Sequence, residues 1–159
     1  MRQVNCAAAF LMIIALAGCS STSPPPDAVA DEVKAAIAIQ VNAYAARDLD
    51  AMMGVMAPDY LWISSGQPNV SGDEAVRAGV AAQFADPALA LSVSDETVEV
   101  AKSGDMAVYH SIYSYTYTDA ETQTPTTQTG NWVAVFRRQE DGSMKLARDL
   151  IVALPDADE

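Results

Sequence analysis

The chain has 159 residues, with 21 acidic side chains against 9 Lys and Arg, and its formal net charge at pH 7 is −12. This length suits one ordinary domain, and an apolar share of 50% is enough to build a hydrophobic core. The acidic balance, without a basic stripe, argues against binding to nucleic acid and against electrostatic adhesion to anionic lipids. We interpret the acidity as a feature that keeps the protein soluble.

The N-terminal segment 1–18 has the pattern of a signal peptide. One cation, Arg2, precedes the apolar run 6–15, which has the length of a signal core and is too short to span a membrane as a helix. The run leads into Leu16-Ala17-Gly18-Cys19, which resembles the processing site of bacterial lipoproteins, where the cysteine is lipidated after cleavage on its amino side. Cleavage as an ordinary secretory signal, without a lipid, is the alternative.

Residues 19–29 form a Ser/Pro-rich linker on this interpretation. The three consecutive prolines at 24–26 favour an extended polyproline II spacer between a membrane and the domain. The predicted membrane contact is a lipid on Cys19. Ser20 stands where an aspartate would indicate retention in the inner membrane, so we expect a cell-envelope protein on the outer membrane, facing the periplasm.

Thiol and metal chemistry are not expected in the folded part. Cys6 leaves with the signal peptide and Cys19 carries the lipid, so no thiol remains for a disulfide, a metal or covalent catalysis. His110 is the only histidine, and zinc sites usually combine several His and Cys ligands. The sequence therefore predicts no metal site and no cofactor.

Three helices are predicted in the first half of the domain, and the first of them starts with Asp27 or Asp31 as its N-cap. Apolar residues at helical spacing give it one buried stripe: Val33, Ile37, Val41 and Tyr44. Several alanines add helix propensity between these positions.

The second and third helices are shorter. Asp48 is the predicted N-cap of the second, and Pro58 stops it. The third helix begins at a capping box formed by Ser71 and Glu74 and ends at 86–87, an Asp-Pro pair.

The second half of the chain predicts strands, because aromatic and branched residues alternate between turn signals. One strand, 59–63, is expected before the third helix. The other expected strands follow that helix and are 89–100, 106–118, 129–138 and 144–154. A Thr/Gln-rich loop at 119–128 and an acidic tail at 155–159 complete the chain. Helices followed by antiparallel strands indicate an α+β fold with a curved sheet wrapped over the helices.

Three groups of residues carry a resemblance to a known family: ARDLD at 46–50 with MAPDY at 56–60, SGDEAV at 71–76, and WVAVFRR at 132–138 followed by DGSMKL at 141–146. In their order and spacing they resemble the SnoaL-like branch of the nuclear transport factor 2-like superfamily, which includes ketosteroid isomerases and polyketide cyclases. The resemblance covers residues 30–154. It implies a cone-shaped fold with three N-terminal helices packed on a strongly curved, mainly antiparallel sheet, a pocket between them, and frequent dimers.

The residues of a ketosteroid isomerase do not carry over to this chain. Counting without gaps from 48–50, the position of the general-base aspartate falls at Ser64, and the position of the oxyanion tyrosine falls at Gln40. Tyr44 lies one helical turn further along. Because a serine cannot abstract a carbon-bound proton without its own base, the isomerase mechanism is disfavoured.

Arg148 and His110 are the candidate catalytic residues. By strict alternation Arg148 shares a face of the last strand with Met144, Leu146, Leu150 and Val152, whereas Asp149 points to the other face. A guanidinium in such a row either anchors an anion in a pocket or forms a structural ion pair. His110 sits similarly among Met106, Val108 and Ile112, and it is either an acid/base near neutral pH or a satisfied core histidine.

The predicted pocket residues are Tyr44, Tyr60, Trp62 and Asn131. The tyrosines at 109, 113, 115 and 117 follow the opposite parity from His110, and they form either a ligand or dimer surface or ordinary cross-strand packing. Three functions follow. The first is binding of a small apolar or amphipathic ligand, the second is an isomerase, cyclase or dehydratase using His110 and Arg148, and the third is a protein-interaction or homodimerisation module.

Overall fold

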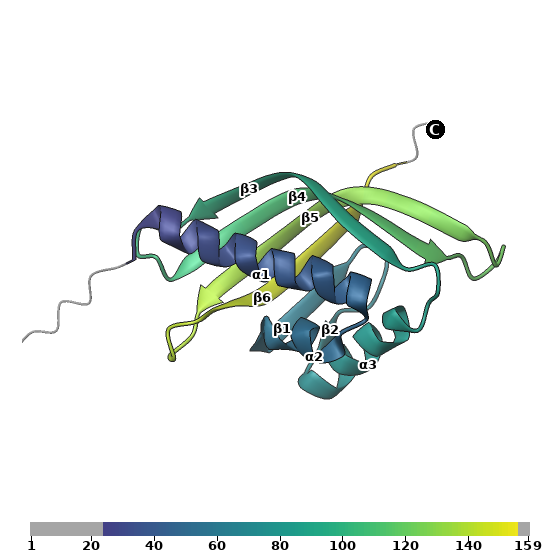
Figure 1. Cartoon of the computed structure of the whole chain (residues 1–159), viewed down its shortest axis with the longest axis horizontal. Helices are drawn as coiled ribbons and strands as arrows, with labels where there is room; N and C mark the ends of the chain where they lie inside the picture. The colour runs from purple at the N-terminus through teal and green to yellow at the C-terminus, as the bar shows by residue number, and fades with distance from the viewer. Residues whose placement is uncertain (1–23, 156–159) are drawn as a thin grey trace, which may run out of the picture.

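The computed structural model describes residues 24–155 (Figure 1). The predicted signal peptide, the lipidation site Cys19 and the first part of the linker lie outside the described residues, as does most of the acidic tail. Within the described part, none of the helices combines the length and the apolar composition that crossing a membrane requires.

The described chain contains three helices and six strands in an α+β arrangement. In chain order they are α1 (Pro26–Ala46), α2 (Leu49–Gly54), β1 (Met56–Ser64), β2 (Val70–Ser71), α3 (Asp73–Phe84), β3 (Ala90–Val100), β4 (Met106–Thr118), β5 (Pro125–Arg138) and β6 (Met144–Ala153). The strands form one sheet in the order β2-β1-β6-β5-β4-β3. The β1–β6 pair is parallel and every other pair is antiparallel.

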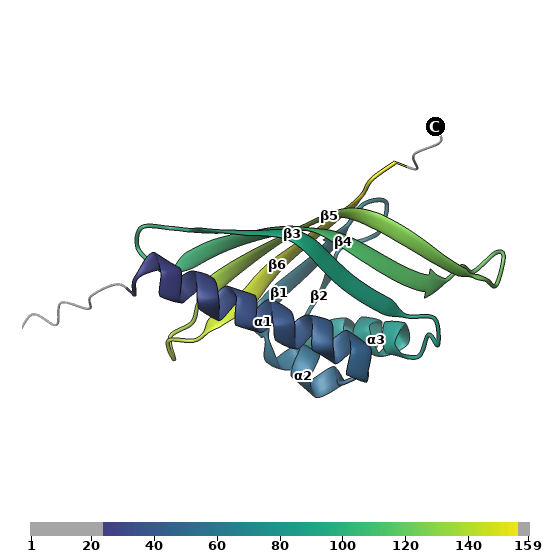
Figure 2. The ribbon, with the colours of Figure 1, turned by 45° about the horizontal axis from the view of Figure 1, so that its top comes forward.

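All three helices lie on one side of the sheet, which curves over them (Figures 1 and 2). The predicted stripe of α1 is buried at Val33, Ile37 and Tyr44, whereas Val41 is half-buried. These side chains pack with Tyr109, Phe136 and Leu146 of the sheet in one hydrophobic core. The predicted α+β fold with helices on a curved, mainly antiparallel sheet is therefore confirmed.

The helix ends were predicted with mixed success. Asp48 caps α2 as expected, because its carboxylate accepts the Ala51 amide at 2.9 Å. Asp27 does not cap α1, since this helix starts at Pro26, which fits the first turn without a donor. The capping box at Ser71 is also wrong, because Ser71 is paired in β2 and leaves Gly72 as the N-cap of α3.

The Thr/Gln-rich loop is shorter than expected. β5 already begins at Pro125, and the threonine hydroxyls of Thr116 and Thr127 pair across the β4–β5 ladder at 2.8 Å. The remaining turn closes on Asp119, whose carboxylate accepts the amides of Glu121 and Thr122. Polar β-branched residues thus extend a hairpin that composition alone assigned to a loop.

A bulge in β6 decides which residues of that strand face the helices. Leu146 pairs with Phe136 and Arg148 pairs with Val135, so Ala147 is an extra residue between two consecutive pairs. Leu146 and Ala147 are both fully buried as a result. From Arg148 onward the alternation is the inverse of the one that an unbroken strand would have.

Candidate functional site

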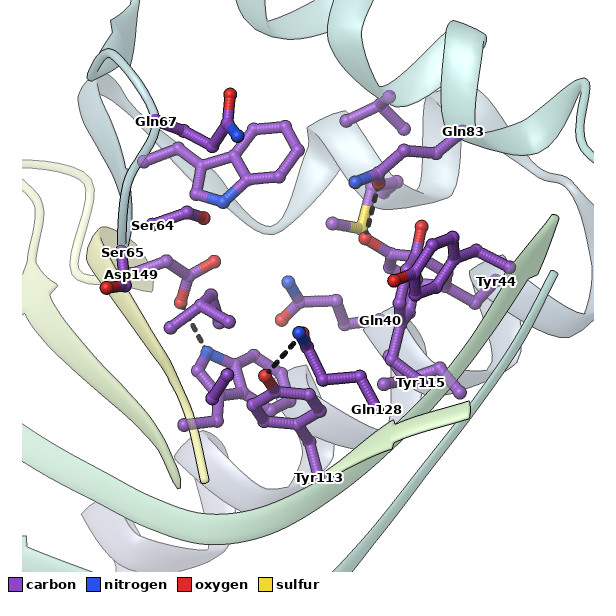
Figure 3. Close-up of a pocket in the computed structure, with 18 of the residues that line it drawn as sticks. Gln40, Tyr44, Ser64, Ser65, Gln67, Gln83, Tyr113, Tyr115, Gln128 and Asp149 are labelled. Atoms are coloured by element: carbon purple, nitrogen blue, oxygen red, sulfur yellow. Dashed lines mark hydrogen bonds between the residues drawn. The ribbon is translucent and has the colours of Figure 1, made fainter. Parts of the chain in front are cut away.

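A cavity of about 410 Å³ lies between the inner face of the sheet and the helices α1 and α3 (Figure 3). Its walls are mainly aromatic and apolar, with a few amides, two serines and one carboxylate. Tyr44, Tyr60, Trp62, Tyr113, Tyr115, Tyr117 and Trp132 are the aromatic members, and Gln40, Ser64, Ser65, Gln67, Gln83, Gln128 and Asp149 are the polar ones.

Asp149 of β6 is the buried carboxylate of this cavity, with 4% of its surface exposed. Its two oxygens each accept one hydrogen bond, from the Tyr60 hydroxyl at 2.8 Å and from the Trp132 indole nitrogen at 2.7 Å. Burial raises the pKa of Asp149 to about 6, although hydrogen bonds from Trp132, Tyr60 and Gln40 oppose the rise. The group is therefore mostly ionised at pH 7 and accepts a proton in mildly acidic conditions.

The tyrosines around Asp149 are neutral hydrogen-bond donors. Burial, together with the charge of Asp149, raises the pKa of Tyr60 far above its usual value of 10.0. Burial is also the main reason why the pKa of Tyr44 is raised well above 10.0. The Tyr44 hydroxyl donates to Gln83 Oε1 at 2.8 Å, so helix α1 is joined to α3 at the edge of the cavity.

The strands β4 and β5 supply the opposite wall. Tyr113 donates to Gln128 Oε1 at 2.9 Å across the hairpin (Figure 3). Its ring lies over Gly130, where a Cβ would stand 2.6 Å from the tyrosine Cε1, so only glycine leaves room for this wall. The Tyr115 ring meets the Tyr44 ring edge-on, with their centroids 6.4 Å apart, and it stacks on the Tyr117 ring, with their centroids 5.7 Å apart.

Asp149 is the one charged side chain among the cavity-lining residues that the structure describes. The lining within 24–155 includes no Lys, Arg or His, so the carboxylate has no counter-ion there. No group of three or more His, Cys, Asp or Glu side chains in the described chain is arranged to hold a metal ion. The site is therefore a cavity with aromatic walls and one negative charge, that of Asp149, which no cationic side chain in the lining neutralises.

Comparison with known proteins agrees with this architecture. The SnoaL-like domain family matches residues 33–147. The chain belongs to this family. No curated protein sequence matches it.

Solved structures share the fold of this SnoaL-like domain. A candidate dehydratase of the nuclear transport factor 2-like family from Streptomyces avermitilis is 19% identical, with a TM-score of 0.69 over 82% of this chain and 99% of that one. A candidate aromatic ring hydroxylase from Novosphingobium aromaticivorans is 20% identical, with a TM-score of 0.71 over 83% and 93%. A ketosteroid isomerase-like protein from Erwinia carotovora atroseptica is 20% identical, with a TM-score of 0.64 over 79% and 95%. At these identities the likeness establishes the fold alone.

Three of the predicted pocket residues of the SnoaL-like domain, Tyr44, Tyr60 and Trp62, line the cavity. The two positions reached by counting from the family pattern, Ser64 and Gln40, line it as well. The tyrosines 113, 115 and 117 also line the cavity, which fits the ligand surface among the roles that the sequence left open for them. The homodimer stays a prediction.

Asn131 is not among the residues that line the cavity, which corrects its predicted placement there, and neither His110 nor Arg148 is among them. His110 Nε2 lies 3.1 Å from Asn131 Oδ1, in a pair between β4 and β5. Arg148 donates to the Asp59 carbonyl at 2.8 Å and forms an ion pair with the Asp59 carboxylate at 3.7 Å. The two candidate catalytic residues therefore do not meet in one cavity.

Asp149 is the residue that sequence reasoning missed. Strict alternation turned Arg148 inward and Asp149 outward, and the bulge at Ala147 exchanges the two. No local pattern marks an alanine as a bulge. The available signal was the spacing of aromatic donors, Tyr60 on β1 and Trp132 on β5, whose polar tips need a partner once they are buried.

Proposed function

We propose that this SnoaL-like domain binds a small, largely apolar ligand in its cavity, with Asp149 as the polar anchor. A volume of about 410 Å³ lies within the range of about 300–1,000 Å³ that is usual for small-molecule sites. Aromatic walls with a few fixed polar groups are the composition that such sites have. The single observation that carries the proposal is the buried carboxylate at the cavity wall, held by Tyr60 and Trp132.

A purely structural role explains this carboxylate poorly. Burying an ionised group without a counter-ion costs free energy, and an apolar residue of similar size would avoid that cost. Carboxylates with perturbed pKa values gather at functional sites, so a buried carboxylate in a cavity wall supports a ligand-binding role.

The test fills the cavity with a tryptophan side chain and uses, as its control, the same substitution at a neighbouring residue of β6 outside the cavity. Ile151 lines the cavity, whereas its neighbour Leu150 does not. We expect Ile151→Trp to abolish retention of small molecules in native mass spectrometry of the protein purified from its host, and Leu150→Trp to preserve it. A wild-type protein that retains no small molecule and binds none from a library of apolar probes would refute ligand binding.

Acid–base catalysis at the same carboxylate is the second candidate function. It is favoured by the position of Asp149, whose pKa of about 6 suits proton transfer near neutral pH, beside a Tyr60 hydroxyl that stays protonated. The reaction class is an isomerisation, cyclisation or dehydration that starts by removing a proton next to a carbonyl. Asp149 then has the acid–base role for which the sequence suggested His110 and Arg148. A substrate turned over equally well by Asp149→Asn would exclude it.

We also propose that the mature protein is a lipoprotein of the cell envelope, anchored through Cys19. The two cysteines of the chain provide a matched pair of variants. Metabolic labelling with an alkyne-tagged palmitate should mark the wild type and Cys6→Ser, but not Cys19→Ser. Label on Cys19→Ser, or an unprocessed wild-type chain in the cytosol, would contradict the anchor.

A further inference from the structure

We propose that the cavity selects an organic cation: a small amine, protonated at neutral pH, on an aromatic or alicyclic body. This inference rests on the proposed ligand-binding function and names the chemical class of the ligand. It follows from the charge of the cavity wall, from the hydrogen-bonding groups left unused there, and from the arrangement of the aromatic rings.

The charge of the wall excludes anions first. Asp149 is the only charged side chain among the described lining residues, so a carboxylate or phosphate ligand would face a negative charge without any cation to offset it. Arg47 follows Tyr44 at the end of α1 but is not part of the lining, and its guanidinium donates to the backbone carbonyls of Tyr44, Asp86 and Leu89. The negative charge of the whole chain, −12, adds to the attraction for cations.

At the Asp149 end of the cavity, the hydrogen-bonding groups favour a ligand that donates. The Tyr60, Trp132 and Gln40 donors are already directed at Asp149. The hydroxyls of Tyr44 and Tyr113 are likewise used, on Gln83 and Gln128. In contrast, Gln40 Oε1 is buried and has no hydrogen-bond partner among the described residues.

The Gln40 side chain extends from α1 into the cavity, toward Asp149 of β6 (Figure 3). The two Asp149 oxygens offer about four acceptor sites, and the donors Tyr60, Trp132 and Gln40 occupy three of them, so an acceptor site remains for a ligand. An ammonium group carries up to three N–H donors and a positive charge, so it satisfies both acceptors and neutralises the carboxylate.

The aromatic rings suit the same ligand. Tyr44, Tyr115 and Tyr117 form a connected cluster of edge-on and stacked rings, and Trp62 is a further aromatic residue of the wall. The indole of Trp62 lies against Gly79 of α3, where a Cβ would stand 3.3 Å from it. The faces of such rings attract cations as well as apolar groups, most strongly where water is excluded.

The experiment compares three probes with the same ring system and different charge: naphthylmethylamine, naphthalenemethanol and naphthoate. Binding is measured by calorimetry at pH 7.5 on the chain from Cys19 onward, produced without the lipid. We expect the amine to bind at least about tenfold more tightly than the alcohol, since hydrogen bonds to charged groups are the stronger ones. Naphthoate should show no measurable binding.

The pH dependence and one substitution connect the preference to Asp149. Lowering the pH through the range in which Asp149 takes up a proton should weaken binding of the amine and leave the alcohol unchanged. The other titratable groups packed at this carboxylate, Tyr60 and Tyr44, have raised pKa values and stay neutral throughout. Asp149→Asn should remove the advantage of the amine, whereas Asp59→Asn, at an exposed acid that is not part of the lining, should retain it.

Each outcome decides between the two proposals. Equal affinity for amine and alcohol, or tighter binding of naphthoate, overturns the organic-cation proposal and leaves ligand binding intact. No binding of any probe, together with no retained small molecule in the native protein, overturns ligand binding itself. If Asp149→Asn does not fold, the wild-type ratio of amine to alcohol affinity and its pH dependence still decide the question.

Discussion

Two adjacent residues of β6, Arg148 and Asp149, lie in opposite environments. Asp149 is 4% exposed, has no counter-ion in the cavity wall, and is held by two neutral donors. The Arg148 side chain is 36% exposed and shares the carboxylate of Asp59, itself 56% exposed, with Arg137. Both sites contain charge, but only the inner one has given up hydration for it, so only the inner one requires an explanation in terms of function.

The largest expected difference between these sites is their pH dependence. The pKa of Asp149 is about 6 in the folded protein, against a usual value of 3.8, so between these values the folded state holds a proton that the unfolded chain has released. The Asp149 contribution to the free energy of unfolding is therefore fully present below pH ~4 and falls by about 3 kcal/mol as the pH rises through 6. Urea titrations of the wild type and Asp149→Asn across this range measure it as the change in their difference.

The pKa of Asp59, the acid on the outer face, is shifted in the opposite direction from that of Asp149. A hydrogen bond from Arg137, helped by the charges of Arg137 and Arg148, lowers the pKa of Asp59 below 3.8, so its contribution is lost only as the pH falls below that value. Asp59→Asn should accordingly leave the slope between pH 4 and 6 as in the wild type. A wild-type slope in Asp149→Asn would show that the buried carboxylate is not the group that titrates.

The next largest effect is expected for Tyr60→Phe. This change removes a 2.8 Å hydrogen bond to the buried carboxylate and should lower the free energy of unfolding at pH 7 by about 2 kcal/mol. It should also raise the pKa of Asp149 further, because a donor to the charged form is lost. Chemical denaturation measures the first effect, and the carboxyl carbon shift of labelled aspartate in NMR measures the second. An unchanged Asp149 titration would contradict the role given to Tyr60.

The smallest effect is expected on the outer face. Arg148→Ala removes a half-exposed ion pair and should cost less than about 1 kcal/mol of unfolding free energy. It should leave the binding of ligands in the cavity unchanged. A loss of binding in Arg148→Ala, without a loss of stability, would restore Arg148 as a site residue and break the contrast between the two faces.

The fold was predictable because its local signals agree with one another. The spacing of Val33, Ile37 and Tyr44 turned one side of α1 toward the core, and the alternation of β4 separated Tyr109 and Tyr113 from His110. Apart from the bulge in β6, the errors concern element ends, such as Ser71, which pairs in β2 instead of capping α3. A competing backbone partner overrides a capping pattern, and a sequence shows the pattern without the competitor.

The sequence by itself determined the α+β composition, the helical and strand periodicities, and three of the residues that line the cavity, Tyr44, Tyr60 and Trp62. Only the tertiary structure decided that Asp149, and not Arg148, faces that cavity. The physical reason is the period of two in a strand: one extra residue, Ala147, reverses every side chain after it, and that residue becomes visible only in the pairing of β6 with β5.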